Sequence, residues 1–144
     1  MFLSEYQYTK LKTLSNDIVK SVYVFLLIII TIYLLSGSTR FEGNVYVLGH
    51  PVCDDHWSEN NAKVICKSLG CSSHTVAVPK TESFFGMPSS RSDYILDNVK
   101  CNGQESHIGS CDYVTVHNCK LNEAAGVKCI DPKDIQLKGG LKNL

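Results

Sequence analysis

The residues best suited to chemistry in this 144-residue sequence are its seven cysteines, which all lie between positions 53 and 129. Cysteines can form disulfides, bind zinc or act as nucleophiles. Successive cysteines are 13, 5, 30, 10, 8 and 10 residues apart, so no C-x-x-C pair is present and the spacing does not repeat as zinc ligand pairs do. Cys53 and His56 form the only local pair with zinc-like spacing. This cysteine density indicates a disulfide-stabilised extracellular module, and the odd count leaves at least one thiol over.

Motifs of the common enzyme classes are absent from the sequence. There is no G-x-S-x-G, H-E-x-x-H, Walker or G-x-G-x-x-G pattern, and the five histidines are scattered between positions 50 and 117. We therefore expect a protein that is not an enzyme. Residues 39–129 carry eight Lys/Arg against ten Asp/Glu, a net charge of −2, whereas a nucleic-acid-binding domain shows a basic stripe. We expect no nucleic-acid partner.

The strongest helix signal follows the first cysteine. Ser58 is a favourable N-cap residue, whose side chain can accept a hydrogen bond from a free N–H of the first turn. Four apolar residues then recur at helical spacing, and Gly70 follows where a helix often ends. The pattern predicts a helix over Ser58–Leu69 that buries Ala62, Ile65, Cys66 and Leu69 on one face.

The remaining elements are predicted to be short strands and loops. Val45 and Val47 alternate with Asn44, Tyr46 and Leu48, as in a half-buried strand whose two valines face the core. Residues 72–94 read as a long loop, beneath which Phe84 and Phe85 are expected to be core anchors. Further strands are expected at Tyr94–Val99, around Val114 and Val116, and at Gly126–Cys129.

The N-terminal part of the chain indicates delivery to an oxidising compartment. Residues 1–20 are polar and are expected to be a cytosolic tail. Residues 22–35 are an uninterrupted apolar run of 14, which matches the core of a signal peptide or the centre of a tilted membrane helix. We expect a signal-anchor over residues 21–38 with the C-terminal domain outside the cell. The alternative is a secreted product, cleaved after Ser38.

Several separated motifs resemble those of the scavenger receptor cysteine-rich (SRCR) domain family. They are C-D-D-x-W at Cys53–Trp57, V-x-C-x-x-L-G-C at Val64–Cys71, L-D-N-V-K-C at Leu96–Cys101, H-N-C at His117–Cys119 and E-A-A-G-V-K-C at Glu123–Cys129. The resemblance implies an α+β fold in which a curved antiparallel sheet cradles one helix. It places the domain at residues 39–130, with a first strand that could begin at residue 32. Residues 131–144 are then either a polar tail or the start of a second SRCR repeat.

The resemblance also implies the disulfide pairing. The pairs carried over from the family are Cys53–Cys119, Cys66–Cys129 and Cys101–Cys111. Phe41 stands where the eight-cysteine form of the domain has the partner of Cys71. Cys71 is therefore expected to be a free thiol, either buried as a small apolar side chain or exposed and able to pair with another chain.

An acidic cluster is the candidate functional site. The implied Cys53–Cys119 bridge would draw Asp54, Asp55 and Glu123 together, and clustered carboxylates are stabilised by a hard cation such as Ca²⁺ or Mg²⁺. The resemblance places a second metal site at Asp55, Asp97 and Asn98. The alternative is that Asp54 and Asp55 only turn the chain before the helix.

The function implied by the resemblance is ligand binding outside the cell. The chain is expected to be a scavenger-receptor-like module that recognises proteins or polyanionic surfaces, with a bound cation receiving an anionic group of the ligand. The alternative is an accessory SRCR domain of a larger extracellular enzyme, such as a protease or an amine oxidase, or of a multidomain receptor.

Overall fold

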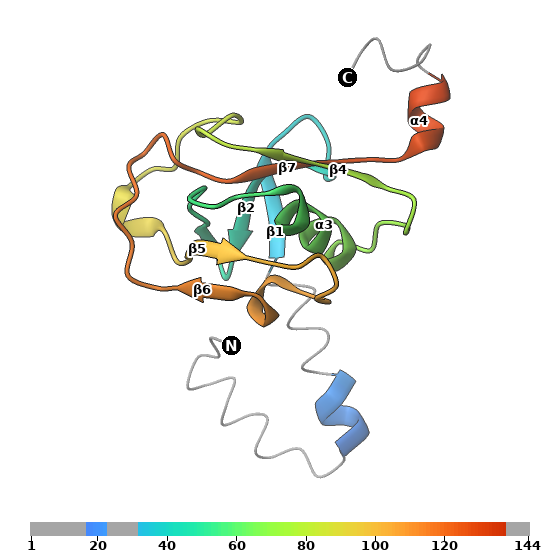
Figure 1. Ribbon diagram of the computed structural model, residues 1–144, viewed down its shortest axis with the longest axis horizontal. Helices are drawn as coiled ribbons and strands as arrows, with labels where there is room; N and C mark the ends of the chain where they lie inside the picture. Colours follow the sequence, from blue (N-terminus) through green and yellow to red (C-terminus); the bar gives the residue numbers. More distant parts are fainter. Residues whose placement is uncertain (1–16, 23–31, 138–144) are drawn as a thin grey trace.

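The computed structural model describes residues 17–22 and 32–137 and forms an α+β domain in which one helix lies against a curved antiparallel sheet (Figure 1). The strand order is β1-β2-β7-β4, and β3 pairs with β2 beside this path. The strands are β1 (Ile32–Ser36), β2 (Glu42–Val47), β3 (His50–Pro51), β4 (Val76–Lys80) and β7 (Gly126–Ile130). β5 (Asp97–Lys100) and β6 (Asp112–Val114) form a separate two-stranded sheet.

The predicted helix is present as α3, Glu59–Ser68, and packs against β4 and β7. Ala62, Ile65 and Cys66 are buried, as the helical spacing predicts, and Leu69 packs against the core from the C-cap position. Ser58 is the N-cap residue, but the expected bond from its side chain to a first-turn N–H is absent. Its hydroxyl donates instead to Asn61 Oδ1, 3.2 Å away, because the buried Asn61 side chain lies over the start of the helix.

Strand β2 shows the predicted alternation only in part. Val45 and Val47 are buried, and Tyr46 is half-buried and stacks on Tyr33 of β1. Asn44 is only 2% exposed, although the alternation placed it on the outer side. A loop covers it there, and its Nδ2 donates to the carbonyl of Gly86 at 2.7 Å.

The first strand begins at residue 32. Ile32–Ser36 pair in register with β2, so a helix over the whole of residues 21–38 is not what the structure shows. A short helix occupies residues 17–22, and residues 23–31, the central half of the expected membrane segment, lie outside the described part. Within the described ranges, no helix is long and apolar enough to cross a bilayer.

Residues 72–94, expected to be a loop-rich connection, contain strand β4, and further predictions also differ from the structure. Phe84 is 57% exposed, so the prediction that it is a core anchor is wrong, and Phe85 is half-buried. The strand expected around Val114 and Val116 ends at Val114, and Val116 is exposed beyond it. Part of the tail forms a short helix, α4 (Pro132–Leu137), because Asp131 caps the Lys133 N–H and proline suits a first helical position.

Candidate ligand and metal site

Three disulfides join the sheet, the helix and the long loops. They are Cys53–Cys119, Cys66–Cys129 and Cys101–Cys111, the same pairs that the resemblance implies. The first closes a separation of 66 residues and brings the start of the helix segment next to the turn before β7. Backbone bonds continue this junction, since the Asp54 N–H donates to the Glu123 carbonyl at 2.8 Å. Two acidic segments far apart in the sequence therefore meet at one edge of the domain.

The junction brings Asp55 to Asp97. One carboxylate oxygen of each lies within 4.8 Å of the other and of both sulfurs of the Cys53–Cys119 disulfide. Asp97 is only 1% exposed, and its Oδ1 accepts the Asn98 N–H at 2.6 Å. Asn98 has a φ of +52°, an unusual backbone conformation that Asn tolerates better than most residues.

The other two predicted acidic residues lie beside this pair and are partly engaged. Asp54 Oδ2 accepts the Glu82 N–H at 2.6 Å, and Glu123 Oε2 accepts the Lys120 N–H at 2.6 Å. Each carboxylate thus stabilises a turn with one oxygen. Asp54 therefore does hold a turn, which was the alternative to metal binding. The second carboxylate oxygen of Asp54 and that of Glu123 take no part in these two backbone hydrogen bonds.

Electrostatics at the junction are unfavourable to the charged carboxylates. Burial is the largest cause that raises the pKa of Asp55, and the charges of Asp97 and Glu123 add to it. Burial also raises the pKa of Asp54, against the Glu82 N–H bond that lowers it. A nearby cation would relieve this repulsion. The donor set, carboxylate oxygens with no free thiolate, suits Ca²⁺ or Mg²⁺.

Glu82 belongs to the site but has no signal in the sequence. It lies 28 residues after Asp54, in the loop that follows β4, and only the tertiary structure brings its N–H to the Asp54 carboxylate. Its charge also raises the pKa of Asp54.

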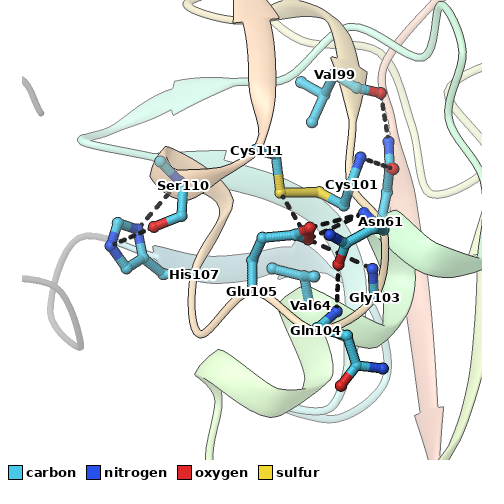
Figure 2. Close-up of a disulfide and its surroundings, with 12 residues drawn as sticks. Asn61, Val64, Val99, Cys101, Gly103, Gln104, Glu105, His107, Ser110 and Cys111 are labelled. Atoms are coloured by element: carbon cyan, nitrogen blue, oxygen red, sulfur yellow. Dashed lines mark hydrogen bonds between the residues drawn. A yellow bond between two sulfur atoms is a disulfide. The ribbon is translucent and has the colours of Figure 1, made fainter.

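A second group of possible metal ligands consists of Glu105 and the two cysteines of the Cys101–Cys111 disulfide (Figure 2). Glu105 accepts the N–H groups of Asn102 and Gly103 at 2.7 and 3.4 Å and closes the small loop on itself. Since both cysteines are in the disulfide, Glu105 is the only ionisable ligand in this group. The arrangement is a loop cap, and it offers a cation too few donors.

Cys71 is the one unpaired cysteine of the described chain and is half-buried. Its N–H bonds to the Cys66 carbonyl just past the end of α3. Burial raises the pKa of its thiol, which Arg40 opposes. A pocket of about 300 Å³ lies beside this helix end and is lined by Tyr33, Leu34, Arg40, Phe41, Leu69 and Gly70.

Comparison with known proteins identifies relatives of the whole domain. A family model described as "Scavenger receptor cysteine-rich domain" matches residues 35–130. A scavenger receptor cysteine-rich domain superfamily protein of Patiria pectinifera is 39% identical over 105 residues, and the CD5 antigen-like protein of Mus musculus is 35% identical over 104. These alignments cover 69% and 68% of this chain but only 9% and 29% of the two relatives.

Two solved structures share the fold. The third SRCR domain of murine neurotrypsin superposes with a TM-score of 0.59 at 36% identity, covering 68% of this chain and 94% of that domain. The dimeric form of the SRCR domain of mouse MARCO gives a TM-score of 0.51 at 34% identity, covering 61% and 85%.

Proposed function

Because this chain belongs to the scavenger receptor cysteine-rich family, we propose that it is an extracellular binding module and not an enzyme, and that it recognises a protein or polyanionic ligand through a divalent cation. Domains of this family are typical of extracellular receptor proteins, and the relatives above include a CD5 antigen-like protein. The disulfides agree with folding in an oxidising compartment.

The observation that carries the cation proposal is the Asp55–Asp97 pair. The two carboxylates lie together beside a disulfide, and Asp97 is almost fully buried. The ion pairs found among the described residues include neither Asp55 nor Asp97. In our proposal Asp55 and Asp97 hold the cation, with the second oxygens of Asp54 and Glu123 nearby. The cation would supply positive charge for an anionic ligand group, and the affinity typical of extracellular calcium modules is about 10⁻⁴–10⁻³ M.

Calcium titration of the folded domain tests this proposal. Calcium should raise the free energy of unfolding of the unmodified protein by RT ln(1 + [Ca²⁺]/Kd), about 1.4 kcal/mol at tenfold Kd. The Asp55→Asn variant should lose this increment. In EDTA the same variant should be at least as stable as the unmodified protein, with a gain of about 0.5 kcal/mol or less, because Asn keeps a polar contact to Asp97 and removes one repelling charge.

Stability measured both with calcium and in EDTA separates a metal-binding role of Asp55 from a purely structural one. Glu59→Gln is the matched control, since Glu59 is an exposed acid that pairs with Lys63 on α3, and it should leave the calcium increment unchanged. A thermal melt of the unmodified protein that millimolar calcium does not shift would defeat the cation proposal and leave Asp54 and Asp55 as turn residues.

For localisation we propose that the apolar residues before β1 stay attached to the domain and anchor it at the membrane. Cleavage after Ser38 would remove β1, including the buried Ile32, and would leave β2 without its edge partner. The N-terminal residue of the mature protein, determined by mass spectrometry, decides the matter. A start at Thr39 would establish the secreted form.

A second candidate function is that of an accessory domain in a longer protein. It is favoured because the chain spans only 9% and 29% of two curated relatives, and because the neurotrypsin domain is the third SRCR domain of its protein. Sequencing of full-length transcripts distinguishes the two. A protease or oxidase signature downstream of Leu144 would support the accessory role.

A further inference from the structure

Phe84 is an exposed aromatic side chain with two lysines close to its ring. Its side chain is 57% exposed, and the Nζ atoms of Lys80 and Lys128 lie 4.5 and 5.6 Å from its ring centre. The lysines come from β4 and β7, which are adjacent strands of the sheet. We call Lys80, Phe84 and Lys128 the Phe84 platform.

The loop that carries the platform is held in a constrained conformation. Glu82 and Ser83 both have positive φ angles, +58° and +50°, which are uncommon for residues other than glycine. Ser83 is buried, and its Oγ donates to the Leu121 carbonyl at 2.7 Å while accepting the Ala124 N–H at 3.0 Å. Backbone strain of this kind persists only where the surroundings over-determine it.

The ring of Phe85 packs against the ring of Phe84 on the side of the sheet. The Phe85 ring lies against Gly126 of β7, and the two phenylalanines meet edge to face with ring centres 4.9 Å apart. One ring is thus anchored on the sheet, and its neighbour is directed outwards. An aromatic side chain that is rigid before binding loses little entropy on contact, which is the property of interface hot spots.

The Phe84 platform itself carries two positive charges, with Glu42 beside Lys128 and Glu82 two residues before Phe84 in the chain. Residues 39–129 carry a net charge of −2, yet two ammonium groups flank this one ring. Lys128 lies 3.8 Å from a Glu42 carboxylate oxygen, a partly exposed pair that is weak in water, while among the ion pairs of the described residues none includes Lys80.

We propose that the Phe84 platform is a second, cation-independent binding surface for an acidic peptide segment that carries aromatic side chains, presented by a protein partner. The ligand's carboxylates meet Lys80 and Lys128, and its aromatic side chain packs on Phe84. A sulfated polysaccharide would satisfy the lysines but would offer the exposed ring only sugar C–H groups and no aromatic partner. The surface differs from the Asp55–Asp97 site because its own ammonium groups and aromatic ring contact the ligand, whereas the acidic site needs a cation before it can receive an anionic group.

Fluorescence anisotropy with the full chain in EDTA tests the proposal. The probes are fluorescein-labelled random poly(Glu,Tyr) in a 4:1 ratio and poly-Glu of matched length. The unmodified protein should bind the tyrosine-containing copolymer about tenfold more tightly than poly-Glu, and Phe84→Ala should abolish this preference. A Lys80→Gln/Lys128→Gln variant should weaken binding to both polymers and reduce the salt dependence.

Exposed residues outside the Phe84 platform supply the control variants. Val116→Ala, at an 87% exposed apolar residue, and Lys63→Gln, at an exposed lysine of α3, should leave binding unchanged. Phe84→Leu retains apolar volume without an aromatic face and should give intermediate affinity, which keeps the test informative if Phe84→Ala fails to fold. Equal affinity for the two polymers, absence of copolymer binding, or tighter binding of labelled heparin than of the copolymer would each overturn the proposal. EDTA in every titration separates this result from that of the calcium experiment.

Discussion

The ring of Phe85 lies so close to Gly126 that a Cβ on Gly126 would come within 2.9 Å of it. The same Cβ would lie 3.1 Å from the Gly43 carbonyl of the neighbouring strand. Gly126 also accepts the indole N–H of Trp57 at 2.8 Å through its own carbonyl. One residue without a side chain therefore lets the loop after β4 dock on the sheet.

Gly126→Ala should destabilise the domain because either Phe85 or β7 must shift to make room. We expect a loss of about 1–3 kcal/mol, the range for overpacking at a tight site. Urea unfolding followed by tryptophan fluorescence measures it. In the Phe85→Ala background the same substitution should cost less, and equal costs in both backgrounds would show that the ring is not the obstacle.

Asn61 should be one of the most sensitive polar positions in the chain. Its side chain is 1% exposed and joins α3 to the segment before the small disulfide loop, donating to the Val99 carbonyl at 2.7 Å and accepting the Cys101 N–H at 3.0 Å (Figure 2). Asn61→Ala leaves both groups without a partner and should cost about 2–4 kcal/mol, measured by chemical denaturation. The neighbouring, exposed Asn60→Ala is the control and should change stability by less than about 0.5 kcal/mol.

Tyr94 gives the domain a specific sensitivity to alkaline pH. Burial raises the pKa of its hydroxyl to about 12, and the hydroxyl donates to the Lys120 carbonyl at 2.9 Å. The folded state holds this proton more tightly than the unfolded state. The contribution of the Tyr94 hydroxyl to the free energy of unfolding is therefore complete below pH 10 and is lost as the pH rises towards 12.

The Tyr94→Phe variant isolates this contribution. The variant should lose about 1 kcal/mol at neutral pH through the missing hydrogen bond. Between pH 10 and about 12 the unmodified protein should lose roughly 1–2 kcal/mol more than the variant does. Unfolding free energies of the two proteins that fall in parallel across this window would contradict the assignment.

Local patterns in the sequence were sufficient to predict the elements whose buried face shows in the spacing of their apolar residues. The helix after Ser58 and the buried faces of Val45 and Val47 were predicted because an amphipathic segment shows its buried side in its own spacing. The fold class and the three disulfide pairs followed from the family resemblance, since spacing alone allows many pairings of seven cysteines.

The tertiary structure decided every feature that depends on where a loop crosses the sheet. Asn44 was expected outside and is buried, and Phe84 was expected in the core and is exposed, because the loop after β4 covers the first and presents the second. Adjacent phenylalanines look alike in a sequence. Gly126 lies about 40 residues further on, and the space that it leaves open determines which of the two rings packs against the sheet.

The acidic site shows the same division. The sequence by itself identified Asp54 and Asp55 as a charged pair before the helix, and the resemblance named Asp97, Asn98 and Glu123. The contact of Asp55 with Asp97, and the attachment of Asp54 to the Glu82 N–H, arise only when the Cys53–Cys119 bridge and the loop packing bring distant segments together. Carboxylate pKa values depend on burial and on neighbours across the fold, so spacing along the chain could not reveal them.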